Sequence, residues 1–141
     1  MENREKWFEI TTEKISVDEV VARLTNPAIG AVVTFVGVVR GETDGREVRY
    51  LEFQACSETA EEVLGQIGDE IRARWPTIQQ VAIVQRVGRL QVGETTLLIA
   101  LCAPHRPEVF DALHYAIDRL NQIVPISKKE VRVDGELQVA S

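Results

Sequence analysis

The first dense apolar segment of the chain, AVVTFVGVVR from Ala31 to Arg40, limits the folds that this sequence can adopt. It is rich in β-branched valine and marked by glycine, so it favours a β-strand over a helix. Apolar runs at 81–87 and 95–103 have the same character and are joined by a connection that contains glycine. We therefore predict strands over all three runs, preceded by a first strand from Phe8 to Ile15.

Other segments have the periodicity of amphipathic helices. Between Ser57 and Trp75, apolar residues recur every three or four positions, which predicts one long helix. A second stripe of this kind begins at Pro107, a residue that the first turn of a helix tolerates, and continues to Val124. A short helix to Leu24 is predicted from the capping box that Ser16 forms with Glu19.

Turn signals complete the expected organisation. Asp44-Gly45 predicts a hairpin between the strand at 31–40 and a strand at 48–55. Asp134-Gly135 predicts a closing hairpin of two strands, 126–133 and 136–139. No linker or repeat divides the chain. We predict a single domain over 1–141 with an α+β fold and largely antiparallel strands.

Composition and charge narrow the class of protein. The 141 residues are 45% apolar, enough to form a core without metal or disulfide staples. The formal charge of −6 argues against a general binder of nucleic-acid backbones. Cys56 and Cys102 are expected to be small buried hydrophobes in a reducing compartment. Without a secretion signal or an apolar run of about 20 residues, the predicted location is the cytoplasm.

Familiar cofactor motifs are missing from the sequence. It has no Walker loop, dinucleotide fingerprint, paired zinc-ligand motif or serine elbow, so no metal or cofactor is predicted. Cations instead occur at the ends of expected elements, where sites are often built. They are Arg40, His105-Arg106 and Lys128-Lys129.

The chemistry of these cations has two interpretations. Arg106 and His105 precede a helix, whose free N–H groups favour an anion, but both could be ordinary solvated residues. Lys128 could act as a nucleophile or proton donor if desolvated, or could simply face solvent. In an extended strand Lys129 points to the opposite face. Asn121, seven residues after His114 on the predicted helix, could face a cleft or only border the core.

Four motifs, in this order and spacing, resemble the catalytic, large subunit of molybdopterin synthase. They are GAVVTFVGVVR at 30–40, RVGRLQVGE at 86–94, APHRPEVFDALHYAID at 103–118 and VPISKKE at 124–130. The resemblance extends over roughly 30–139. It implies an α/β hammerhead fold with an additional antiparallel sheet, and two large subunits that form a central dimer. A small ubiquitin-like sulfur carrier docks at each end, which gives a heterotetramer.

The family resemblance also implies a reaction. The C-terminal thiocarboxylate of the carrier gives sulfur to cyclic pyranopterin monophosphate, which becomes the dithiolene of molybdopterin. The enzyme is thus a sulfurtransferase of molybdenum cofactor biosynthesis. Such chemistry needs a pocket that holds an anionic phosphate and the carrier tail together, which clustered cations would supply.

Roles of individual residues are carried over from matching positions. Lys128 corresponds to the catalytic lysine, and Lys129 and Glu130 lie beside it. The resemblance implies that His105 and Arg106 bind the anion, and in the family this pair can serve the pocket of the neighbouring protomer. It assigns substrate contact to the strand end formed by Val38, Val39 and Arg40.

Departures from the family pattern leave alternatives open. Asn121 stands where a second functional lysine is usual, and an amide supplies neither an imine nor a charged proton. Ser127, Gln85 and Cys56 replace a usual tryptophan, histidine and tyrosine. The chain could therefore be an active enzyme that depends on Lys128 alone, or an impaired homologue acting as a binding or regulatory subunit. A third possibility is an unrelated binder of small anions.

Overall fold

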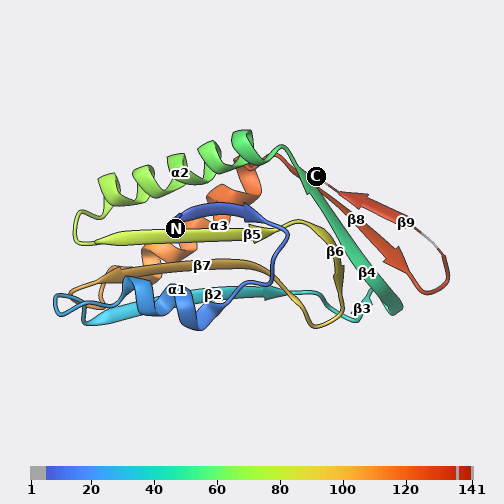
Figure 1. The fold of residues 1–141 in the computed structure, drawn as a ribbon, viewed down its shortest axis with the longest axis horizontal. Coiled ribbons are helices and arrows are strands. Elements are labelled where there is room, and N and C mark those ends of the chain that lie inside the picture. Colours follow the sequence, from blue (N-terminus) through green and yellow to red (C-terminus); the bar gives the residue numbers. More distant parts are fainter. Residues whose placement is uncertain (1–5, 136, 141) are drawn as a thin grey trace, which may run out of the picture.

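The structure, a computed structural model, describes residues 6–135 and the backbone of residues 137–140. Within these described residues, three helices and nine strands follow one another (Figure 1). The elements are β1 (Phe8–Thr11), α1 (Val17–Leu24), β2 (Ala31–Val38), β3 (Glu42–Thr43), β4 (Arg46–Ala55), α2 (Ser57–Arg74), β5 (Gln80–Arg86), β6 (Gly88–Gln91), β7 (Thr95–Ala103), α3 (Val109–Ile123), β8 (Ile126–Arg132) and β9 (Leu137–Ala140).

The first sheet has the strand order β1-β5-β7-β2. β1 is parallel to β5, and the other neighbours are antiparallel. Successive side chains of β5 and β7 point to opposite faces of the sheet, because side chains alternate along a strand. Ile83 and Ile99 face the main core under α2 and α3, whereas Ala82 and Ala100 face α1. Both faces are thus covered by helices.

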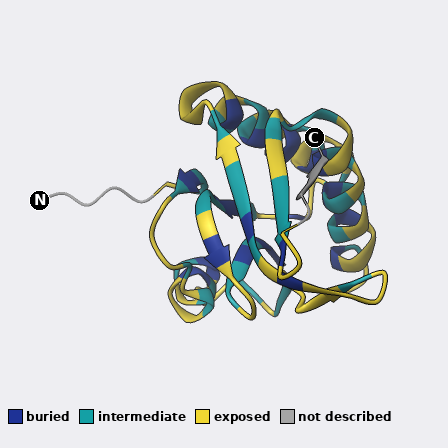
Figure 2. Cartoon of the chain, turned by 90° about the vertical axis from the view of Figure 1, so that its right-hand side faces the viewer, coloured by how far each residue is buried: buried dark blue, intermediate teal, exposed yellow. Residues whose placement is uncertain are grey.

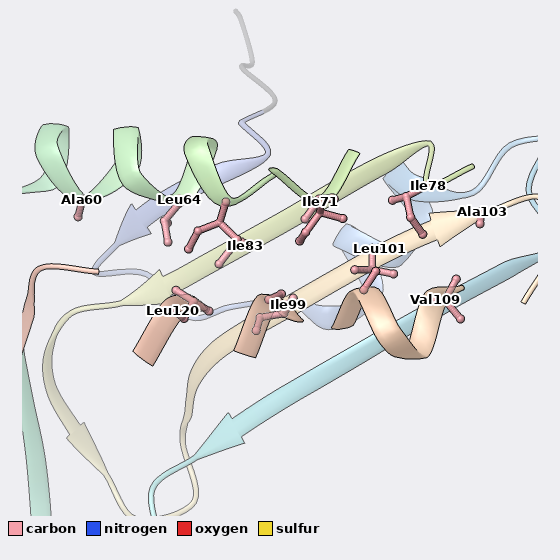
Figure 3. Packing of buried hydrophobic residues seen from close by; sticks show 14 of the residues in the cluster. Ala60, Leu64, Ile71, Ile78, Ile83, Ile99, Leu101, Ala103, Val109 and Leu120 are labelled. Atoms are coloured by element: carbon pink, nitrogen blue, oxygen red, sulfur yellow. The ribbon is translucent and has the colours of Figure 1, made fainter. Parts of the chain in front are cut away.

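Packing of the main core follows the predicted helical stripes. In Figure 3 the side chains of Ala60, Leu64 and Ile71 on α2 point toward the strands of the first sheet. Leu120 and Val109 on α3 contribute to the same cluster. Burial of these apolar groups, at about 25 cal/mol per Å², fixes both helices on one face of the sheet.

The second sheet has the strand order β3-β4-β8-β9, and β6 also pairs with β4. It faces the viewer in Figure 2, where exposed and intermediate residues occupy much of its outer surface. Its inner face contains a small cluster of Val39, Val48, Leu51 and Leu90. This sheet carries the lysine pair on β8, so its junction with the first sheet positions the site.

The predicted hairpin between 31–40 and 48–55 is wrong. β2 pairs with β7 in the first sheet, and the Asp44-Gly45 turn instead joins the short β3 to β4. Positive φ angles at Asp44 (53°) and Gly45 (77°) suit a tight two-residue turn. The chain therefore leaves the first sheet after Val38 and enters the second sheet at β3, before the Asp44-Gly45 turn.

Other expected elements need smaller corrections. β1 ends at Thr11 rather than Ile15, β6 lies in the segment expected to be a connection, and α3 begins at Val109 rather than Pro107. Cys56 was expected to be buried but is exposed, because it is the N-cap residue of α2. Cys102 is buried, as predicted.

Most of the predicted elements are confirmed. α1 begins after Ser16, whose hydroxyl accepts a hydrogen bond from the Glu19 backbone N–H at 3.2 Å. The closing hairpin forms between β8 and β9, although Glu136 lies outside the described residues. The α+β class with mixed and antiparallel sheets is also confirmed. Among the described residues no helix is long and apolar enough to cross a membrane.

Candidate active site

A pocket of about 230 Å³ lies where α3 and β8 meet the ends of β5 and β7. Its lining residues come from five different elements, β4, β5, β7, α3 and β8, and five of the eight are apolar. Its polar lining residues are Gln85, Asn121 and Lys128, and its apolar ones are Phe53, Leu97, Leu120, Val124 and Ile126. The structure therefore brings Lys128 and Asn121 into one pocket, although they belong to different secondary-structure elements.

Strand geometry separates the two lysines of β8. Lys128 pairs with Phe53 across the β4–β8 ladder, and Lys129 pairs with Glu52. Because successive side chains alternate, Lys128 faces the pocket while the Lys129 ammonium lies 3.3 Å from a Glu52 carboxylate oxygen. Both lysines border a second hollow of about 180 Å³, which Ser127 also lines. Lys128 forms no ion pair with any described residue, so its charge is available to a ligand.

Asn121 reaches the pocket from the last turn of α3. The preceding residue, Leu120, is buried in the core, and this contact fixes the rotation of the helix. His114, seven residues earlier, is exposed, and its Nε2 lies 3.5 Å from Oδ2 of Asp118. His114 is therefore not in this pocket, although helical spacing had placed it near the face of Asn121.

The residues at the end of β2, from Val38 to Arg40, differ in burial. Val38 is 52% exposed, whereas Val39 is only 2% exposed and packs with Val48 in the second sheet. Arg40 is exposed, and its side chain has no hydrogen-bond partner within the described part of the chain. Arg40 follows the strand end that pairs with Thr95, so it lies at the pocket end of the first sheet but does not line the pocket.

Glu130 has two partners inside the second sheet. Its carboxylate accepts hydrogen bonds from Arg132 Nε at 2.8 Å and from Thr43 Oγ1 at 3.1 Å. Both partners hold Glu130 away from the lining of the pocket. The carboxylate of Glu130 on β8 is therefore linked to Thr43 on β3.

His105 and Arg106 lie at the opposite end of the first sheet. Ala103 at the end of β7 pairs with Ala31 at the start of β2. The strand between that end and Arg40 has eight residues, or roughly 25 Å at about 3.3 Å per residue. Both side chains are exposed. One chain therefore does not bring His105 and Arg106 to the pocket of Lys128.

Gln85 departs from the family pattern and is not among the predicted site residues. It lines the pocket and is 6% exposed. The sequence signal that could have identified it is its spacing: Gln85 is a polar residue that follows Val81 and Ile83 at intervals of two in an apolar strand. Arg119, by contrast, points toward α2, where its Nε donates to Glu70 at 2.8 Å.

Comparisons with known proteins identify the family of the chain. A family model described as MoaE protein matches residues 10–123. The molybdopterin synthase catalytic subunit of Halalkalibacterium halodurans is 42% identical over 134 residues, which cover 95% of this chain and 85% of that relative.

Solved structures show the same likeness. The crystal structure of molybdopterin synthase from Staphylococcus aureus matches with a TM-score of 0.92 and 41% identity, over 98% of this chain and 99% of that one. A complex of subunits 1 and 2 of molybdopterin-converting factor from Helicobacter pylori shares the fold, with a TM-score of 0.76 at 16% identity over 94% and 89% of the two chains. From the family match and the identity over nearly its whole length, the chain belongs to the MoaE family, that of the molybdopterin synthase catalytic subunits.

Proposed function

We propose that this chain transfers sulfur as the catalytic subunit of molybdopterin synthase. The sulfur comes from the C-terminal thiocarboxylate of a small ubiquitin-like carrier and goes to cyclic pyranopterin monophosphate. The observation that carries this proposal is the meeting of Lys128 and Asn121 in one pocket, which polar and apolar side chains line together. The family membership of the chain supports it.

The chemistry of the pocket suits two anionic reactants. Lys128 supplies a positive charge that can hold a thiocarboxylate beside the pterin and donate a proton as sulfur is transferred. Apolar side chains of Phe53, Leu97 and Ile126 line the same pocket and can pack against the pterin ring. The thiocarboxylate sulfur forms a C–S bond to a side-chain carbon of the precursor as a C–O bond at that carbon breaks and its oxygen leaves. Water then cleaves the bond between this sulfur and the carrier, which restores the carboxylate on the carrier and leaves the sulfur on the pterin.

Asn121 limits how this pocket can work. Its amide can hydrogen-bond to a substrate but supplies no positive charge. Lys128 is the lysine among the lining residues, so we expect turnover to depend on it. The comparisons give no support to a non-catalytic homologue, because the matched relatives are catalytic subunits.

The proposal includes a carrier protein as partner and the cytoplasm as location. The solved Helicobacter pylori assembly contains two subunits of a molybdopterin-converting factor, which supports a small-subunit partner for this chain. The free cysteines Cys56 and Cys102 suit a reducing compartment.

We also propose that two copies of the chain complete each other's site. β2 is at the edge of the first sheet, and within the described residues its outer side pairs with no strand. Antiparallel pairing of two such edges would bring the end of one sheet beside the opposite end of the other. His105 and Arg106 of one copy would then approach Arg40 of its partner. The phosphate of the pterin would bind there.

Reconstitution with a thiocarboxylated carrier and the pterin precursor tests the proposed reaction. The product is followed after oxidation to a fluorescent pterin. We expect Lys128→Ala to lower kcat at least about 100-fold, the usual scale for loss of a positioned acid or charge.

Lys129→Ala is the matched control, because the neighbouring lysine faces Glu52 rather than the pocket. It should retain kcat within about twofold, since an exposed ion pair contributes little. Full activity of Lys128→Ala would contradict the proposed function. Activity that appears only in Asn121→Lys would instead identify an impaired enzyme.

A further inference from the structure

Gln85 is a polar residue in an apolar row of β5. Val81 and Ile83 precede it on the same face of the strand, and both are fully buried in the main core. Gln85 itself is 6% exposed and lies at the end of this row, where the core opens into the pocket. A buried amide destabilises the fold unless its polar atoms find partners, so its hydrogen bonds indicate what it does there.

The amide of Gln85 is held in one orientation. Its nitrogen donates to the backbone oxygen of Arg86 at 2.8 Å and to that of Thr96 at 3.0 Å. These two bonds use both N–H hydrogens, and a flipped amide would place an oxygen against two carbonyl oxygens. The atom left for the pocket is Oε1, which accepts no hydrogen bond from any residue that the structure describes. Gln85 therefore presents a fixed acceptor.

The remaining lining of the pocket indicates which ligand this acceptor suits. Lys128 supplies a positive charge, and apolar side chains such as Leu97, Phe53 and Ile126 line the space beside the polar groups. A flat ring would pack against these apolar groups. If the ring carries an N–H donor on one edge, that edge fits Oε1, and a negative group elsewhere fits Lys128.

We propose that Gln85 determines specificity by accepting a hydrogen bond from the amino group on the pyrimidine edge of the pterin. This bond directs the opposite side of the ring system, which receives sulfur, toward Lys128. The inference rests on the proposed function, because it assumes that the pocket holds the pterin. The apolar walls favour a flat ring over the glycine tail of the carrier.

Binding of pterin and lumazine to the full chain tests this inference. Lumazine has the same bicyclic ring, but a carbonyl oxygen replaces the 2-amino group, so a donor becomes an acceptor. We expect the wild type to bind pterin about tenfold more tightly, because lumazine would set a carbonyl against Oε1. Gln85→Met removes the acceptor at similar length and should reduce the preference to within about twofold.

A control variant separates recognition by Gln85 from a general change in β5. Gln80→Met changes a glutamine of the same strand that does not line the pocket, so it should retain the preference for pterin. Because the preference is a ratio of two affinities, partial unfolding of a variant does not alter it.

Three results would overturn the role of Gln85. They are a wild type that does not discriminate between the two rings, a Gln85→Met variant that keeps the preference, and a Gln85→Met variant in which only the KM for the carrier rises. Turnover assays on the same samples distinguish this failure from failure of the proposed function. Product formation without discrimination rejects Gln85 alone, whereas no product and no pterin binding reject the proposed function.

Discussion

Glu70 on α2 joins this helix to α3 through two side chains of α3, and Gln66 of its own helix also holds its carboxylate. Its carboxylate accepts hydrogen bonds from Arg119 Nε at 2.8 Å, from Tyr115 Oη at 2.7 Å and from Gln66 Nε2 at 3.0 Å. These donors stabilise the charged form, with Arg119 having the largest effect, and lower the pKa of Glu70 from 4.5 to about 2. The network fixes the rotation of α3, which carries Asn121 into the pocket.

The lowered pKa of Glu70 predicts how stability varies with pH. The unfolded chain binds a proton at Glu70 near pH 4.5, but the folded chain only near pH 2. The stabilisation is therefore complete above about pH 5 and is lost as the pH falls toward 2. We expect Glu70→Gln to lower the free energy of unfolding by about 1–2 kcal/mol at neutral pH, a modest value because the side chain is 26% exposed.

Chemical denaturation at a series of pH values measures this effect. The difference between Glu70→Gln and the wild type should shrink steadily below about pH 5. Glu62→Gln is the control, since Glu62 is an exposed residue of the same helix with no hydrogen-bond partner among the described residues. A difference that stays constant from neutral pH to pH 3 would show that the network does not depend on the charge of Glu70.

The site could be predicted only in part from individual residues. Alternation along an extended strand was enough to separate Lys128 from Lys129, and the structure confirms that separation. The partners of Glu130 and the burial of Val39 depend on long-range packing, which local patterns do not contain. Gln85 was missed as a site residue because one polar residue in an apolar strand does not reveal which cavity it meets.

Helix α2 contains two glycines whose surroundings differ. A Cβ atom built on Gly68 would lie 2.3 Å from Cζ of Phe8, so β1 packs directly against the helix backbone there. A Cβ atom on Gly65 would lie 3.9 Å from the same ring, which is an ordinary contact. The close approach at Gly68 thus brings β1 against α2.

We expect the two substitutions by alanine to have opposite effects. Gly65→Ala should stabilise the protein by about 0.5–1 kcal/mol, because alanine favours the helix. Gly68→Ala should destabilise it by about 1–2 kcal/mol, because displacement of the Phe8 ring outweighs the gain in helix propensity. Thermal unfolding of both variants measures the difference. Equal stabilisation by both would show that β1 does not pack closely on Gly68.

The elements themselves were more predictable than their pairing. Periodicity identified α2 and α3, because each buries one apolar stripe against a sheet, and the capping box at Ser16 identified α1. The hairpin error arose because Asp44-Gly45 defines a turn but not which strands it joins. β6 is only four residues long and forms its ladder with β4, more than thirty residues earlier, so no local pattern predicted it.

The arrangement of the whole molecule separates two groups of candidate binding residues. Lys128, Asn121 and Arg40 lie toward one end of the first sheet, and His105 and Arg106 lie at the other. A helix or a strand is too rigid to bend either group toward the other within one chain. Contact between the two groups therefore requires a second copy, for which the edge of β2 offers an unpaired strand in the described part of the chain.

Subunit complementation tests this shared site most directly. If the site is shared as proposed, we expect Lys128→Ala and Arg106→Ala each to be inactive or weak as homodimers, because both sites lack one group. In a mixed dimer, one site regains Lys128 from one copy and Arg106 from the other. Co-expression of the two variants should therefore restore about a quarter of wild-type activity, since half of the dimers are mixed and each has one intact site. Activity no higher than that of the two separate homodimers would contradict a site built from two copies.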